Sequence, residues 1–174
     1  MLGQFLIIIF SILYGIISFQ KEYYGEVITY LCMTMPMAVI ATIEWIRHPY
    51  KEEKNQVEIS QVSIKMIVKT LVYSLAITFV LYFVLKFFNT ANLPISTLSV
   101  TTSFAAVYLT FCRSEYYALG YAANDIVLII MWIMVSINDM SCFPMIACFV
   151  MFFINDIYGF INWQKMKKNQ LKHL

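Results

Sequence analysis

The sequence is poor in the residues on which most enzyme and metal sites depend. It has only 2 histidines, His48 and His173, and both lie in polar flanks of apolar segments. Its 4 cysteines show no CxxC or Cys/His spacing, so we interpret them as small apolar packing residues. HExxH motifs, phosphate loops and nucleophile–base pairs are absent from the sequence. We therefore expect no enzyme activity, no cofactor and no bound metal.

Charge is also scarce. Charged residues make up 13% of the chain and the net charge is +2, which is too small to indicate nucleic-acid binding. Hydrophobic residues make up 61%, and the mean hydropathy of +0.73 lies outside the range of soluble domains. At 174 residues the chain has room for one helical bundle. The composition predicts an all-α integral membrane protein with a single transmembrane domain over residues 1–174.

Apolar segments account for most of the chain. A helix needs about 20 apolar residues to cross a hydrocarbon core of about 30 Å. We expect Pro36 to kink the second segment, residues 47–63 to form the only sizeable polar loop, and the third segment to face lipid as a connecting helix. The six predicted transmembrane helices are residues 6–19, 26–46, 64–87, 96–112, 116–137 and 142–163.

Lysine and arginine are unevenly distributed over the connections between these segments. In a six-helix topology with both termini inside, 10 of the 12 basic residues fall on the cytoplasmic side, and only Lys21 and Lys86 fall outside. Such an excess of positive charge on one side is typical of the cytoplasmic side. The sequence therefore predicts a multi-pass protein of the bacterial cytoplasmic (inner) membrane with both termini in the cytoplasm.

Polar side chains in the fifth segment are the main candidates for a binding site. A carboxylate at the centre of a bilayer costs roughly 2.5–3.5 kcal/mol on insertion scales, so it usually has a role. Rings on the same helix face would stack on a flat aromatic ligand, while amide and carboxylate groups bind its polar atoms. Alternatively, Asp125 only joins this helix to the fourth segment through Ser and Thr hydroxyls. The residues of this face are Tyr117, Tyr121, Asp125, Leu128 and Trp132, with Asn124 at its edge.

The fourth and sixth segments carry further polar faces. The fourth has small and hydroxylated residues at helical spacing, which favours close helix packing: Ser96, Ser99, Thr102, Ser103 and Ala106. In the sixth, Asn155, Gly159 and Asn162 share one face, with Asp156 and Trp163 beside it. Asp156 is either a ligand group or an interhelical hydrogen-bonding group, and Trp163 alone is more typical of an interfacial anchor.

Three stretches resemble a known family. NTANLPISTLSVTTSFAAVYLTFCRSEYYALGYAANDIVLIIMW, followed by NDIYGFINWQKMKK, strongly resembles the bacterial nicotinamide riboside transporters of the PnuC family, and YYGEVITYL resembles that family's stretch after its second helix. The resemblance covers nearly the whole chain. It implies uptake of nicotinamide riboside for NAD synthesis by facilitated diffusion with alternating access, with the substrate trapped inside by a separate kinase. It also implies a homotrimer.

The resemblance also implies a domain plan. The family fold is a 3+1+3 arrangement of helices related to the SWEET sugar transporters, and this chain is expected to lack the first helix of the leading triple. The implied units are a partial first repeat at residues 1–48, a linking helix at 64–88 and a second three-helix repeat at 96–168.

Site residues can be carried over at matching positions. Many family members have a Trp-x-x-Trp pair leading into an Asp. Here the Asp is Asp125, the second aromatic residue is Tyr121 and the first position is Ala118, with Tyr117 beside it. Asn124, Asn155, Tyr158 and Gly159 lie in matching stretches, and Tyr14 matches a family tyrosine. The predicted substrate-binding residues are Tyr14, Tyr117, Tyr121, Asn124, Asp125, Asn155, Tyr158 and Asn162.

Two other classes of function remain open from the residues. One is a membrane protein that does not transport, either a truncated form or a ligand-binding subunit. The other is a carrier of a related nucleoside or sugar. A neutral sugar is disfavoured because a carboxylate among aromatic rings suits a cationic aromatic group better.

Overall fold

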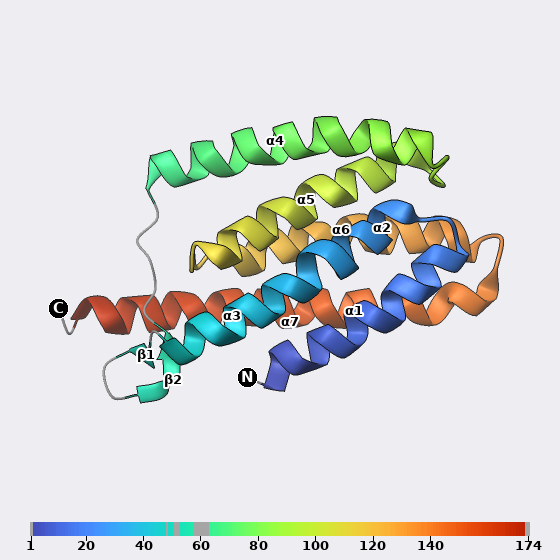
Figure 1. The fold of residues 1–174 in the computed structure, drawn as a ribbon. Helices are drawn as coiled ribbons and strands as arrows, with labels where there is room; N and C mark the ends of the chain where they lie inside the picture. The colour runs from blue at the N-terminus through green and yellow to red at the C-terminus, as the bar shows by residue number, and fades with distance from the viewer. Residues whose placement is uncertain (1, 48, 51–52, 58–62, 173–174) are drawn as a thin grey trace.

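The computed structural model describes residues 2–47, 49–50, 53–57 and 63–172 and is dominated by helices that lie along one another as a bundle (Figure 1). The long helices are α1 (Leu2–Gln20), α4 (Ile64–Phe87), α5 (Leu93–Phe111), α6 (Tyr117–Ser136) and α7 (Phe143–Lys172). A further rod is built from α2 (Tyr24–Ile28), the π-helix η1 (Thr29–Thr34) and α3 (Met35–Arg47). A single 3-10 turn, η2 (Met140–Cys142), precedes α7. The prediction of an all-α architecture is confirmed.

The two ends of the bundle differ in construction (Figure 1). At one end, here the turn end, three connections meet, at residues 21–23, 88–92 and 137–139. The backbone N–H of Ala91 donates to the carbonyl of Glu22 at 3.1 Å, and the Asn92 amide donates to the Tyr23 hydroxyl at 2.7 Å. The opposite end, here the termini end, has the α5–α6 connection and a small antiparallel hairpin, β1 (Pro49–Tyr50) and β2 (Glu53–Val57).

The predicted segments coincide with helices, with differences at their bounds. Among the described residues, four stretches are long and apolar enough to cross a membrane: Ile64–Phe87, Leu93–Phe111, Tyr117–Ser136 and Met140–Asn169. Leu6–Gln20 and Tyr24–Ile40 are shorter apolar helices. Helix α7 continues through the basic tail to Lys172, well beyond the predicted end. The predicted polar loop at 47–63 contains the β1–β2 hairpin in its described part.

The second segment departs from regular helix earlier than the Pro36 kink that the sequence predicts. The irregular part is η1, which ends two residues before Pro36. There the backbone N–H of Met35 donates to the carbonyl of Tyr30, five residues back. Proline lacks an N–H group and its ring clashes with the carbonyl four residues earlier, and a wide π turn accommodates both effects.

Helix α4 lies at the edge of the bundle. Its apolar side chains are exposed on most sides, with Ile64 and Phe87 both 80% exposed. Only a narrow strip is buried, formed by Thr70, Ser74 and Leu85. Helix α4 packs mainly against α5 (Figure 1), which leaves a broad apolar surface of the kind that acyl chains cover.

The remaining helices form two groups. Helix α1 packs closely against α2, η1 and α3, whereas α5, α6 and α7 pack against one another in sequence order. The α2–η1–α3 rod contacts α5 and so joins the groups. Helix α1 reaches α6 and α7 through large side chains, as in the contacts of Tyr14 with Trp132 and Phe149. The space between α1 and these two helices therefore holds the core of the molecule.

Candidate functional site

Two carboxyl groups meet between α6 and α7. Asp125 of α6 is 4% exposed, and its carboxyl group lies within hydrogen-bonding contact of the Asp156 carboxyl group on α7. The second oxygen of Asp125, Oδ2, is buried and has no hydrogen-bond partner in the described part of the chain. Two adjacent carboxyl groups cannot both carry an uncompensated charge in a site of low dielectric constant. The pair is therefore a place where a proton or another cation is favoured.

Aromatic side chains surround this acid pair. Tyr117 packs edge-on against Trp163, with ring centroids 4.8 Å apart and an interplanar angle of 71°. Tyr121 follows one turn later on α6, and its hydroxyl is within reach of Thr110. Tyr30 of η1 lies close enough to feel the charges of both aspartates. The arrangement combines negative charge with ring faces and hydroxyl groups.

Asn124, the neighbour of Asp125, joins α6 to α5. Its Oδ1 atom accepts hydrogen bonds from Thr102 at 2.7 Å and Ser103 at 2.9 Å, and Ser99 donates at 3.4 Å. Asn124 is 2% exposed. The helix-joining role that the sequence left open for Asp125 thus belongs to Asn124, and the hydroxylated face of α5 packs as predicted.

A layer of buried rings lies between the acid pair and the turn end. It is formed by Tyr14, Tyr30, Trp132 and Phe149, each 8% exposed or less. The indole Nε1–H of Trp132 donates to the Tyr14 hydroxyl at 2.9 Å, and that hydroxyl donates to Glu26 Oε2 at 3.4 Å. This chain of contacts connects α6, α1 and α2 across the interior.

The structure brings some of the predicted site residues together and separates others. Tyr117 and Tyr121 are both half-buried and follow one another on α6 ahead of the buried Asp125, and Tyr14 lies in the ring layer. Asn124 points toward α5 instead, where its side-chain oxygen accepts hydrogen bonds from the hydroxyl groups of that helix.

The remaining predictions concern α7. Asn155 is exposed, and Asn162, half-buried, lies seven residues further along the same side of the helix. Tyr158 is 65% exposed and stands two positions from Asp156, which places it on the opposite side of α7. These three residues are not gathered around the acid pair.

The predicted substrate-binding residues do not include two carboxylates of the interior. The sequence leaves Asp156 open between a ligand group and an interhelical hydrogen-bonding group. In the structure it shares one helix face with Gly159 and Trp163, at i+3 and i+7, and this face packs on α6. Glu26 was placed only as the start of a segment, yet it is fully buried. Its position within the apolar stretch YYGEVITYL, where a carboxyl group is costly, was the available signal.

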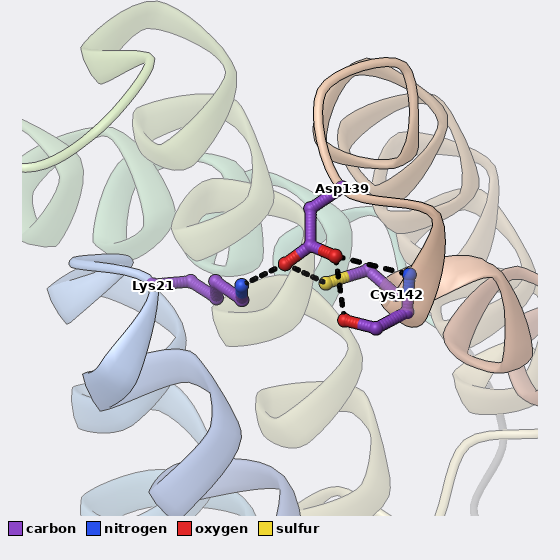
Figure 2. A network of polar contacts seen from close by, with 4 residues as sticks. Lys21, Asp139 and Cys142 are labelled. Atoms are coloured by element: carbon purple, nitrogen blue, oxygen red, sulfur yellow. Dashed lines mark hydrogen bonds and ion pairs between the residues drawn. The ribbon is translucent and has the colours of Figure 1, made fainter.

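Ion pairs stand at both ends of the bundle. At the turn end, Lys21 pairs with Asp139, which also accepts from the backbone N–H and hydroxyl of Ser141, as Figure 2 shows together with Cys142. At the termini end, Lys167 of α7 pairs with Glu115, which is 1% exposed. In the described residues no group of three or more His, Cys, Asp or Glu side chains could hold a metal ion.

Comparison with known proteins identifies the family. A family model described as "Nicotinamide mononucleotide transporter" matches residues 1–165. The chain belongs to this family. The resemblance to the PnuC transporters is thereby confirmed, and the apolar helices are those of a multi-pass membrane protein.

Two known proteins are similar to most of this chain. The curated protein "Nicotinamide riboside transporter PnuC" of Neisseria mucosa (strain ATCC 25996 / DSM 4631 / NCTC 10774 / M26) is 26% identical over 161 residues. That match covers 90% of this chain and 61% of the relative, so the chain spans about three fifths of the relative's length. The solved "Crystal structure of the Vitamin B3 transporter PnuC" has the same fold, with a TM-score of 0.82 and 22% identity, covering 95% of this chain and 72% of the other.

Proposed function

We propose that this member of the nicotinamide mononucleotide transporter family carries nicotinamide riboside into the cell. The observation that carries the proposal is the contact between Asp125, which is buried, and Asp156, which is half-buried, among the rings of Tyr117, Tyr121 and Trp163. Nicotinamide riboside has a flat pyridinium ring with a positive charge and a ribose with hydroxyl groups. The single ring charge offsets one negative charge of the acid pair, and aromatic faces attract a desolvated organic cation.

The acid pair favours the riboside over its phosphorylated form. A phosphate group carries negative charge and needs basic side chains or backbone N–H groups to bind. Among the described residues, neither carboxyl group of the pair forms an ion pair, and Lys21 and Lys167 are paired with Asp139 and Glu115. A phosphate near Asp125 and Asp156 would therefore be repelled.

The same proposal includes the finer architecture. Residues 1–48 form a partial first repeat, 64–88 the linking helix and 96–168 the second repeat of a 3+1+3 plan. The close packing of α1 with α2–η1–α3, of α5 with α6 and α7, and the edge position of α4 support this division. The termini end faces the cytoplasm, supported by the distribution of basic residues, and transport proceeds by alternating access.

The experiment is uptake of labelled nicotinamide riboside by bacterial cells that lack their own carrier and express this chain. Parallel cultures express Asp125→Asn, which keeps the shape of the side chain and removes the charge. We expect uptake in the first culture, a loss of about tenfold or more in the second, and competition by unlabelled riboside but not by the mononucleotide. Membrane levels of each protein are measured by immunoblot.

Two outcomes would contradict the proposal. If the parent chain, correctly inserted, takes up no riboside, then this chain is not a riboside carrier. If Asp125→Asn transports as well as the parent, the acid pair does not recognise the substrate.

A further inference from the structure

Glu26 carries a buried carboxyl group that is separate from the pair of Asp125 and Asp156. It is 0% exposed, and its Oε1 atom has no hydrogen-bond partner in the described part of the chain. Its contacts are hydroxyl groups, since Tyr14 donates to Oε2 at 3.4 Å and Ser99 lies within hydrogen-bonding reach. No described basic residue forms an ion pair with it. Burying a carboxyl group without a cation is costly, so a transient cationic partner would explain its presence.

The side chains next to Glu26 are those that bind organic cations. The rings of Tyr14 and Tyr30 are in contact, with centroids 4.4 Å apart and an interplanar angle of 67°. Trp132 stands 5.9 Å from Tyr14, and its indole N–H orients the Tyr14 hydroxyl toward Glu26. A carboxylate beside several aromatic faces is the combination that attracts flat or quaternary ammonium groups.

The position of Glu26 suits a binding step that comes before the ligand reaches Asp125 and Asp156. Glu26 lies in the first turn of α2, directly after the turn end, whereas Asp125 lies more than two turns from the beginning of α6 at the termini end. Tyr30 lies between them, within electrostatic reach of both Glu26 and Asp125. Helix α1 meets α6 here through side chains such as Tyr14 and Trp132, so the rings would separate if α1 were displaced from α6.

We propose that Glu26, Tyr14, Tyr30 and Trp132 form a second binding station for a flat aromatic cation, on the turn-end side of Asp125 and Asp156. In this structure the rings fill the station, and a ligand enters when they separate. The inference rests on the proposed function, because it gives the riboside a first binding place on its way to the acid pair.

The test is fluorescence quenching of Trp132 in the purified full chain, with Trp45→Phe and Trp163→Phe as background. The probes are 1-methylnicotinamide, a permanent aromatic cation because its ring nitrogen is methylated, and nicotinamide, its neutral counterpart. We expect saturable quenching by the cation in the background protein and an affinity about tenfold lower in Glu26→Gln. Glu22→Gln is the matched control, because it removes the same charge four residues earlier from an exposed position, and it should match the background.

Two further variants separate the station from folding defects and from the acid pair. Tyr14→Phe keeps the ring but removes the hydroxyl that contacts Glu26, and it should weaken cation binding severalfold without changing the response to nicotinamide. Asp125→Asn should keep the Trp132 quenching while losing uptake, since Trp132 is two turns away.

Equal affinities for the cation in Glu26→Gln, Tyr14→Phe and the background would overturn the inference, as would equal quenching by both probes. Thermal melting shows whether each variant is folded, and if Glu26→Gln does not fold, Tyr14→Phe decides. Because quenching needs no transport, a chain that fails to take up riboside but still binds the cation through Glu26 would refute the proposed function and support the station.

Discussion

Asn124 of α6 accepts a hydrogen bond of 2.7 Å from the hydroxyl of Thr102 on α5. The next residue, Asp125, faces Asp156 on α7 instead. Consecutive residues point about 100° apart around a helix, so two adjacent polar side chains serve two different neighbours. Asn124 holds the helices together, and Asp125 is left with an unpartnered oxygen in the interior.

Asn124→Ala should destabilise the bundle. The substitution leaves the hydroxyls of Thr102 and Ser103 without their common acceptor, and an interhelical hydrogen bond in a membrane is worth about 0.6–1.7 kcal/mol. We expect a loss of about 1–2 kcal/mol, measured by denaturation in detergent. Asn155→Ala is the control, because Asn155 is exposed on α7, and an equal loss in both variants would contradict the role of Asn124.

Asp156→Asn should reduce riboside uptake as strongly as Asp125→Asn. Both carboxyl groups belong to one site, so the double variant should be hardly worse than either single one, since residues in direct contact are not additive. The measurement is a double-mutant cycle, in which initial uptake rates are compared for the parent, the two single variants and the double variant. Independent effects that multiply in the double variant would show that the two aspartates act separately.

Gly120 and Gly159 should respond differently to alanine. A Cβ atom on Gly120 would lie 3.0 Å from Cα of Ala106 on α5, whereas one on Gly159 meets only Cβ of Ala118 at 3.9 Å. Alanine favours a helix over glycine by about 1 kcal/mol, so Gly159→Ala should be neutral or stabilising. Gly120→Ala should lose about 1–3 kcal/mol by forcing α5 and α6 apart. Melting temperatures that rise in both variants would refute this close packing.

The Lys21–Asp139 pair should give a stabilisation that depends on pH. The Lys21 ammonium and the Ser141 donors hold the pKa of Asp139 well below its ordinary value, and the same pair raises the pKa of Lys21. A carboxyl group with a lowered pKa in the folded state stabilises the fold above its unfolded pKa of about 4 and loses this effect as the pH falls further. A lysine with a raised pKa contributes until the pH rises past about 10.

The measurement is the difference in melting temperature between the parent and Asp139→Asn as a function of pH. It should be constant between about pH 5 and 9 and shrink below about pH 4. Lys86→Met serves as the control, because Lys86 lies at the same end of the bundle and forms no ion pair among the described residues. A difference that grows on acidification would contradict the assigned direction.

Several features of this protein follow from its sequence by itself. Apolar runs identify a membrane protein and place its helices, because hydropathy and the helical period are properties of neighbouring residues. The same period identified the face of α6 on which Asp125, Leu128 and Trp132 are buried, and the small, hydroxylated face of α5. The stretches from Asn89 onward also identified the family.

Other features were decided only by tertiary structure. Tyr14 and Trp132 are 118 residues apart, and so are Lys21 and Asp139, so no local pattern records that they meet. Helical spacing could not tell that Asn124 faces α5 while Asp125 meets Asp156. It also could not tell that Glu26 accepts a hydrogen bond from Tyr14 while Tyr158 is exposed. The rotation of each helix about its axis is set by how all the helices pack together, and that rotation decides which polar side chain finds a partner.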